Sequence, residues 1–317
     1  MLKKKKNYIY PLLAWAAVEP LPTLAATTLY VTNVARRAIN YTNEEIQTYK
    51  NINNFSSHKI YYLHNGAHLG DNVYNLILFY IIKKYIETNN IQIYYYTKDE
   101  YLPQLREFVC SENIKLNSIN NKPHSSIEIW ICNNFFKYTH SPKVFHISFN
   151  KFYINFFNIV LSKLKLNCSI NKLFYIDNDL IERYDKIPSI YKDFDILILN
   201  SQPLSDQYKY DKNLWDNYII NLNKKFRVLT TTKVNGILCT YDNRLTIKDI
   251  ASLSTKAKVI IAINSGVVPG LLNYYTLTNI KHFYNFDDRC FFSYPNFENK
   301  KLITDIHFEE LEKYINQ

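Results

Sequence analysis

Most of the residues in this chain whose types and spacing suit chemistry lie in two short turns. The chain has five glycines in 317 residues, and four of them fall in these turns. The first turn runs from His64 to Asp71, and the second runs from Asn264 to Gly270. Glycine lets a backbone bend sharply and approach a ligand closely. Because each turn follows an apolar run and precedes a helix-like run, both are predicted to bind a ligand or to perform chemistry.

The first turn ends on a carboxylate, Asp71, at the start of a predicted helix. As an N-cap, Asp71 would accept hydrogen bonds from free helix amides. As a general base, it would take a proton from an attacking hydroxyl. A helix N-terminus lowers a carboxyl pKa, so a base here is expected to be ionised at neutral pH but weaker than a buried one. The residues of this turn that are candidates for contacting an acceptor are His64, Asn65, Gly66, His68 and Gly70.

His64 and His68 are four residues apart. On a helix this spacing would suit a metal ion, but in a glycine-containing loop it carries little meaning. We therefore expect neither a metal nor a cofactor at this turn. Either histidine is instead a candidate contact for a phosphate or a sugar hydroxyl.

The second turn opens with Asn264, Ser265 and Gly266. Free backbone amides and the Ser265 hydroxyl would form an anion site suited to a diphosphate, although an ordinary strand–helix turn is an equally simple interpretation. Lys212 is a candidate for neutralising phosphate, but a solvated surface lysine is the simpler interpretation. Neither turn has the glycine spacing of a dinucleotide fingerprint or a P-loop, which disfavours a nicotinamide enzyme and an NTPase.

The elements that must position these turns alternate between strand and helix. In the first half, strands are predicted at 59–63, 91–96, 114–117, 127–132 and 144–147, and helices at 71–87, 100–109 and 152–166. In the second half, strands are predicted at 194–199, 226–230, 236–240, 258–263 and 280–284, and helices at 214–222, 246–254, 266–274 and 305–315. Thr246 and Asp249 have the spacing of a capping box for one of these helices.

This βαβα order predicts two mainly parallel sheets covered by helices, each in a Rossmann-like domain. The predicted organisation is a leader over 1–57, an N-terminal Rossmann-like domain over 58–176, a linker over 177–193 and a C-terminal Rossmann-like domain over 194–317. Open parallel sheets bind ligands at the carboxyl ends of their strands. If the two sheets face each other by those edges, the two turns meet across a cleft.

Charge and cysteine content exclude several classes of function. The net charge is +10, but residues 1–37 contribute six basic side chains against one glutamate. The rest of the chain shows no basic stripe, so we expect no nucleic-acid partner. The five cysteines are widely spaced without a CxxC pair, which favours free thiols in a reducing, cytoplasmic compartment.

The first forty residues differ from the remainder in being rich in alanine and proline behind four lysines. Their longest uncharged stretch is shorter than the ~18–20 apolar residues of a spanning helix. The interpretations are a disordered leader, a targeting segment, or a basic segment that holds the protein peripherally on a membrane surface.

Several segments resemble glycosyltransferase family 9, the heptosyltransferase-like enzymes. KIYYLHNGAHLGDNVYNLI is similar to the family's opening strand, glycine-rich loop and helix, and VIIAINSGVVPGLLN is similar to its late strand and turn. Between them, DFDILILNSQP, KNLWDNYI and LTIKDIASLSTKAK follow the family's order. The resemblance covers roughly residues 59–285.

The resemblance implies a GT-B fold, an active site between two Rossmann-like domains, and metal-independent transfer of a sugar with inversion. It implies that the N-terminal domain is the acceptor domain and that the C-terminal domain is the nucleotide-sugar domain. It places the family's catalytic aspartate on Asp71. It places the donor-phosphate turn on Asn264, Ser265 and Gly266, with Ser201 at the first turn of the second domain. The chain departs from the family in having Asn264 where an acid is usual, and Pro269-Gly270-Leu271 where His-Leu-Ala is usual. These departures argue against an ADP-heptose donor and a lipopolysaccharide acceptor, and leave room for another nucleotide sugar.

The leading hypothesis is an inverting glycosyltransferase that moves a sugar from a nucleotide sugar to a hydroxyl of a glycan or glycolipid, with Asp71 as general base. The alternative is a non-catalytic GT-B-like module that binds a glycan or a nucleotide sugar. A third, weaker hypothesis is a structural α/β protein that binds no sugar nucleotide.

Overall fold

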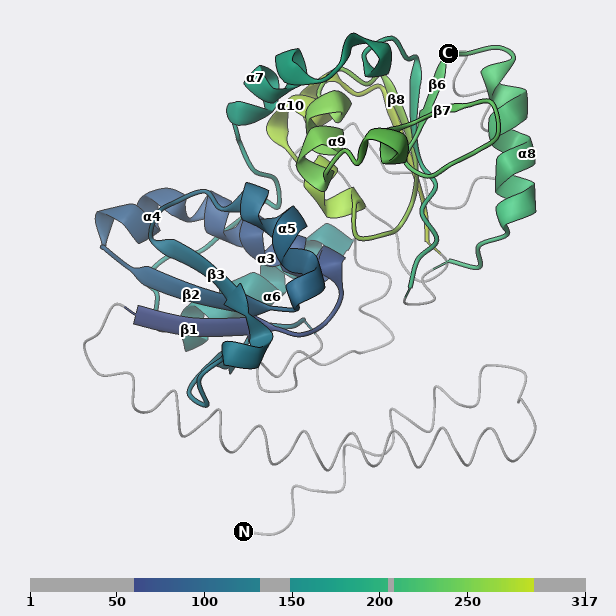
Figure 1. Ribbon diagram of the computed structural model, residues 1–317. Helices are drawn as coiled ribbons and strands as arrows, with labels where there is room; N and C mark the ends of the chain where they lie inside the picture. Colours follow the sequence, from purple (N-terminus) through teal and green to yellow (C-terminus); the bar gives the residue numbers. More distant parts are fainter. Residues whose placement is uncertain (1–59, 132–148, 205–207, 288–317) are drawn as a thin grey trace, which may run out of the picture.

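A computed structural model describes residues 60–131, 149–204 and 208–287. The described chain forms two α/β domains that lie side by side, each built on a parallel sheet (Figure 1). This confirms the predicted fold class. The leader over 1–57, the predicted strand over 144–147 and the predicted helix over 305–315 lie outside the described residues.

The first sheet has four strands in the order β3-β2-β1-β4, all parallel. Its strands are β1 (Ile60–Asn65), β2 (Gln92–Thr97), β3 (Ile114–Ser118) and β4 (Ile127–Glu128). The first two are rich in isoleucine and tyrosine, which suit a pleated, half-buried surface. β4 is shorter than the predicted strand over 127–132, because its pairing with β1 covers two residues.

The helices of this domain are α3 (Leu69–Ile81), α4 (Lys83–Thr88), α5 (Leu102–Leu105) and α6 (Phe149–Lys163), and its 3-10 turns are η2 (Asp99–Tyr101), η3 (Arg106–Phe108) and η4 (Ile119–Asn121). The predicted helix over 71–87 is therefore broken at Ile82, and the one over 100–109 is a single α-turn between two 3-10 turns. Two asparagines inside α3 are fully buried, and the Tyr95 hydroxyl of β2 satisfies both. It donates to Asn72 Oδ1 at 2.7 Å and accepts from Asn75 Nδ2 at 2.9 Å.

The second sheet has five parallel strands in the order β7-β6-β5-β8-β9. They are β5 (Ile196–Leu199), β6 (Val228–Thr230), β7 (Leu238–Cys239), β8 (Val259–Ile263) and β9 (His282–Phe286). β5 and β8 are apolar and buried throughout, as expected for central strands covered on both faces. In each sheet the strand order reverses beside the first strand, between β1 and β4 and between β5 and β8. Open sheets bind ligands at such reversal points.

The helices of the second half are α7 (Asp179–Lys186), α8 (Lys212–Asn223), α9 (Ile247–Ser254) and α10 (Tyr274–Asn279), with 3-10 turns η7 (Ser189–Tyr191), η8 (Thr240–Asn243) and η9 (Val268–Leu271). The predicted capping box is confirmed: Thr246 and Asp249 exchange both hydrogen bonds at the start of α9. Two predictions differ from the structure. The segment over 177–193 contains the packed helix α7, and the helix expected over 266–274 is η9 followed by α10.

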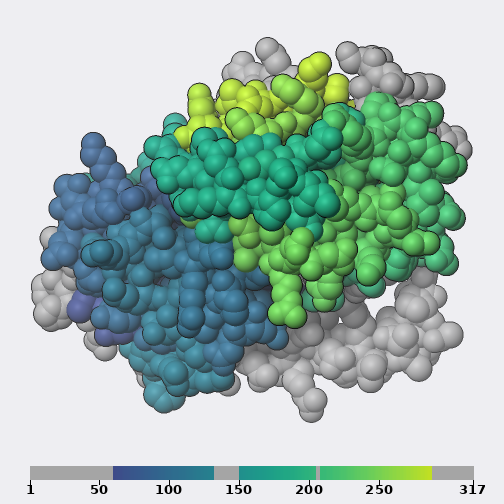
Figure 2. Space-filling model, turned by 45° about the horizontal axis from the view of Figure 1, so that its top comes forward, coloured from purple at the N-terminus to yellow at the C-terminus, as the bar shows by residue number. Residues whose placement is uncertain are grey.

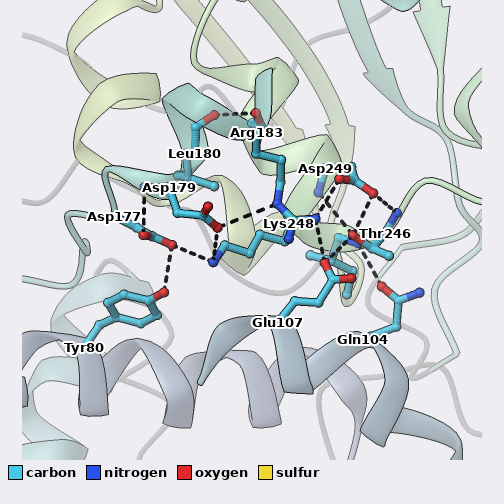
Figure 3. Close-up of polar contacts among 12 residues, drawn as sticks. Tyr80, Gln104, Glu107, Asp177, Asp179, Leu180, Arg183, Thr246, Lys248 and Asp249 are labelled. Carbon is cyan, nitrogen blue, oxygen red and sulfur yellow. Dashed lines mark hydrogen bonds and ion pairs between the residues drawn. The ribbon is translucent and has the colours of Figure 1, made fainter. Parts of the chain in front are cut away.

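Polar contacts join the two domains along one side (Figure 3). Arg183 of α7 donates to Glu107 of the first domain at 2.9 Å and to Asp249 of α9 at 2.8 Å. Gln104 accepts a hydrogen bond from the Ile247 amide at 2.8 Å, so a side chain of the first domain caps α9 of the second. On the face shown in Figure 2, the two domains pack against each other with the α7 segment, in teal, across their junction. Their relative placement is therefore held by specific contacts.

Candidate active site

The first turn joins β1 to α3 at the reversal point of the first sheet. Helix α3 begins at Leu69 with His68 as its N-cap residue, so Asp71 is the third helical residue. The prediction that Asp71 is the N-cap is therefore wrong. The helix starts earlier than the apolar spacing indicated, and the N-cap residue lies three positions before Asp71. From this position the Asp71 carboxylate reaches back and accepts a hydrogen bond from the His68 amide.

The Asp71 carboxylate is fixed by groups from three elements. The Tyr153 hydroxyl of α6 donates to Asp71 Oδ1 at 2.5 Å, and the Trp130 side chain beyond β4 also bonds to it. Burial raises the pKa of the Asp71 carboxyl above its usual value, and the hydrogen bonds from Tyr153 and Trp130 lower it only in part. Position near a helix N-terminus predicts a lowered pKa and a weakened base, but burial outweighs that effect.

In the remainder of the first turn His64 and Asn65 are buried, His68 is exposed, and the other residues are half-buried. Asn65 Oδ1 accepts from the Ala67 amide at 2.9 Å, which fixes the bend of the loop. Asn65 Nδ2 and His64 Nδ1 are buried without a hydrogen-bond partner among the described residues. At Gly66 a β-carbon would lie 3.0 Å from Cδ1 at the end of the Ile119 side chain, so a larger residue there would require that side chain to shift.

His64 is held neutral beside a lysine. Its Nε2 lies 3.1 Å from Lys122 Nζ, and burial, with the Lys122 charge, lowers the His64 pKa to about 3. Because the ammonium donates to Nε2, the ring proton is assigned to Nδ1. The described residues contain no group of three or more His, Cys, Asp or Glu side chains arranged to hold a metal ion.

The second turn follows β8, at the reversal point of the second sheet. Asn264 donates from its amide to the Phe286 carbonyl at 3.0 Å and from its side chain to the Asp287 carboxylate. Ser265 Oγ is buried, and no described residue hydrogen-bonds to it. The predicted helix N-terminus is not present, because the turn leads into the four-residue η9, which contains Pro269. An anion here would be held by the turn's own amides and by Ser265, with no long helix behind them.

The two turns meet. A β-carbon at Gly70 would lie 3.2 Å from Gly266 Cα, and one at Gly266 would lie 3.3 Å from the Gly70 amide nitrogen. The expectation that the turns face each other is thus confirmed at atomic contact. Asp71, Ser265 and Asn264 are each within two residues of this contact, so the packing brings the carboxylate of the first turn close to the polar residues of the second.

The other predicted donor residues are Ser201 and Lys212. Ser201 follows β5, and its hydroxyl is 3.4 Å from Thr231 Oγ1. Lys212 is the first residue of α8; its side chain is 62% exposed and pairs with Asp216 one turn along. The structure describes no contact between Lys212 and the second turn. Its role as a phosphate partner stays a prediction.

Three residues of this region were missed by reasoning on the sequence. Tyr153 is one of 28 tyrosines, and its contact with Asp71 spans 82 positions. Trp130 lies two residues after β4, and Asp287 follows β9 directly. Trp130 falls inside the strand predicted over 127–132, which hid its place at the strand's end. For Asp287 the signal available in the sequence was its position shortly after a predicted strand, since strand ends gather at one edge of a parallel sheet.

Comparison with known proteins gives a match in structure alone. No family model matches the sequence, and no curated protein matches it either. Among solved structures, the chain is similar to the E. coli heptosyltransferase WaaC with ADP-2-deoxy-2-fluoro heptose. The identity is 8%, the TM-score is 0.50, and the match covers 81% of this chain and 99% of that one. The fold is that of the heptosyltransferase-like glycosyltransferases.

Two further structures resemble the chain more loosely. The glycosyl transferase family 9 protein from Veillonella parvula is 11% identical, with a TM-score of 0.47 over 81% of this chain and 90% of that one. The E. coli ADP-heptose lps heptosyltransferase II is 10% identical, with a TM-score of 0.42 over 81% of this chain and 99% of that one. It is the WaaC structure that confirms, at the level of fold, the heptosyltransferase-like resemblance seen in the sequence. No helix in the described part of the chain is long and apolar enough to cross a membrane.

Proposed function

We propose that this protein is an inverting glycosyltransferase that moves a sugar from a nucleotide sugar to an acceptor hydroxyl, without a metal ion. The observation that carries the proposal is the contact between the two turns. It places the Asp71 carboxylate close to a turn in which the buried Ser265 hydroxyl has no hydrogen-bond partner among the described residues. The heptosyltransferase-like fold supports the same activity class.

In the proposed reaction, Asp71 accepts the proton of the acceptor hydroxyl as that oxygen attacks the anomeric carbon. The new C–O bond forms as the bond between the anomeric carbon and the diphosphate breaks on the opposite side. The nucleoside diphosphate departs with the electron pair, and amides near Ser265 and Gly266 stabilise its charge electrostatically. A raised pKa makes Asp71 a stronger base than a surface aspartate, which suits this role.

The hydroxyl acceptor is a glycan or glycolipid in this proposal, bound by the first domain. The polar groups available to it are Asn65 Nδ2 and His64 Nδ1, which have no partner among the described residues. The basic leader lies outside the described residues, and contact of that leader with a membrane surface is part of the proposal.

The test is a thermal-shift screen against UDP-, GDP-, ADP- and CMP-sugars, followed by nucleotide release from any ligand that stabilises the fold. Release that requires an acceptor supports the transferase. Stabilisation without release favours the binding module, and the absence of both favours a structural protein. In the active case, Asp71→Asn should lower turnover by about 10²–10⁴-fold. Unchanged transfer by a folded variant would rule out Asp71 as the base.

A further inference from the structure

A carboxylate and an amide form one unit at the edge of the second sheet. Strands β8 and β9 are paired up to Ile263 and Phe286, so Asn264 and Asp287 are the next residue on each strand. Asn264 Nδ2 donates to Asp287 Oδ2, and the Asn264 amide donates to the Phe286 carbonyl at 3.0 Å. Asn264 is 7% exposed and Asp287 is 4% exposed. The pair is therefore built into the fold at the point where the second turn begins.

The chemistry of the pair fixes which way the Asn264 side chain faces. A carboxylate accepts hydrogen bonds and does not donate them, so Nδ2 of the asparagine must face Asp287. The carbonyl oxygen Oδ1 then faces away from Asp287. No described residue donates a hydrogen bond to this oxygen. With an apolar or neutral residue in place of Asp287, the amide could turn over and present Nδ2 instead.

We propose that Asp287 is a positioning residue of the donor site, which holds the Asn264 carboxamide so that Oδ1 accepts a hydrogen bond from a hydroxyl of the donor's sugar. This inference rests on the proposed function. The negative charge of Asp287 also disfavours a phosphate beside Asn264. The diphosphate is thereby directed to Ser265 and Gly266, where the buried Ser265 Oγ has no partner among the described residues.

In this proposal the two ends of the second turn bind different parts of the ligand. Asn264, backed by Asp287, takes a hydroxyl-bearing sugar, and Ser265 with Gly266 takes the anion. A free nucleoside diphosphate would use the second end alone, whereas a nucleotide sugar would use both. Comparing these two ligands separates a positioning role of Asp287 from a merely structural one.

The experiment measures Kd for the nucleotide sugar that gives the largest thermal shift and for its nucleoside diphosphate, with wild type and Asp287→Asn. The sugar nucleotide should bind about 3- to 10-fold more weakly to the variant, the range of one neutral hydrogen bond. The nucleoside diphosphate should bind within about twofold of wild type. The matched control is Asp195→Asn, at the opposite end of the same sheet, where Asp195 pairs with the exposed Arg227; it should change neither Kd.

Exchanging the amide and the carboxylate between positions 264 and 287 distinguishes a loss of affinity from a folding defect. Asn264→Asp alone sets two carboxylates side by side, which raises the pKa of one of them. The folded variant then loses stability as the pH rises through that raised pKa. The double variant Asn264→Asp/Asp287→Asn restores one amide and one carboxylate. It again presents an acceptor oxygen, so both its melting temperature and its affinity for the nucleotide sugar should recover.

Equal weakening of both ligands by Asp287→Asn, or no weakening of either, would overturn the positioning role. So would a double variant that regains its melting temperature but not its affinity for the nucleotide sugar. Failure of the proposed function looks different. In that case wild type itself binds no nucleotide sugar, and the donor role of Asp287 falls with it. Binding without transfer would remove the catalytic proposal and leave the positioning role supported by the two Kd values.

Discussion

Gly70 and Gly266, 196 positions apart in the numbering, touch through their backbones at the junction of the two domains. Neither residue has a positive φ; among the described residues Gly236 is the one glycine that does. What these two positions require is the absence of a side chain. The close approach of the two backbones therefore brings Asp71, the neighbour of Gly70 in the sequence, near Ser265, the neighbour of Gly266.

Gly70→Ala tests that contact. A β-carbon there would lie 3.2 Å from a backbone atom, Gly266 Cα, which cannot move aside as a flexible side chain does. We expect a loss of about 1–3 kcal/mol in the free energy of unfolding, as for other overpacked sites, and weaker binding of the nucleotide sugar. Urea unfolding and ligand-induced thermal shifts measure the two effects.

Gly236→Ala is the matched control for that variant. Gly236 has a φ of 73° with open space around its missing β-carbon. An alanine there costs about 1–2 kcal/mol through backbone strain alone. Stability should fall and nucleotide-sugar binding of the folded protein should not. Equal effects of Gly70→Ala and Gly236→Ala on binding would contradict a role for the glycine contact in placing the turns.

Tyr153→Phe should alter the pH dependence of turnover. The Tyr153 hydroxyl stabilises the ionised Asp71 carboxylate at 2.5 Å, so its removal raises the Asp71 pKa further. Because the base must be ionised, the acid limb of the kcat/KM profile should move to higher pH. A pH–rate series from pH 5 to about 9 measures the shift. A limb that stays in place, or moves to lower pH, would argue against Asp71 as the titrating base.

Lys248→Met should destabilise the domain junction strongly. Lys248 Nζ lies 3.0 Å from Asp177 and 2.9 Å from Asp179, with its side chain 6% exposed (Figure 3). Removing one partner of such a buried ion pair costs about 3–5 kcal/mol. Urea unfolding at pH 7 measures the loss. Lys83→Met, which breaks the exposed pair with Glu87, is the control and should change stability by less than about 0.5 kcal/mol.

The same variant carries a pH prediction. The hydrogen bond and charge of Lys248 lower the pKa of the Asp179 carboxyl. A lowered carboxyl pKa contributes stability above the unfolded-state value, and that contribution is lost as the pH falls through the folded-state value. The difference between wild type and Lys248→Met should therefore shrink on acidification below about pH 4. A difference that grows on acidification would contradict the ion pair.

Ser265→Ala separates ligand binding from stability. Because no described residue hydrogen-bonds to the buried Ser265 hydroxyl, the ligand-free protein should change by less than about 0.5 kcal/mol. Binding of a nucleoside diphosphate should weaken by about 3- to 10-fold, as for one lost hydrogen bond. Ser254→Ala is the contrasting variant: its hydroxyl is buried and bonded to Ala251 and Thr276, so it should lower stability and leave nucleotide affinity unchanged.

The sequence alone determined the strand–turn–helix order, the two glycine turns and the capping box at Thr246. These are local properties, because propensity, apolar spacing and capping act within a few residues. It also identified Asp71 as the carboxylate of the first turn. The same local reasoning misjudged the second turn, where Pro269 and Gly270 give a 3-10 turn in place of a long helix.

Only the tertiary structure decided the chemical character of the site. The pKa of Asp71 is set by burial and by Tyr153 on a helix 82 positions away. The orientation of Asn264 is set by Asp287 on the next strand, and the meeting of Gly70 with Gly266 depends on how whole domains pack. Burial and long-range contacts are properties of the assembled sheet edges, so no window of sequence contains them.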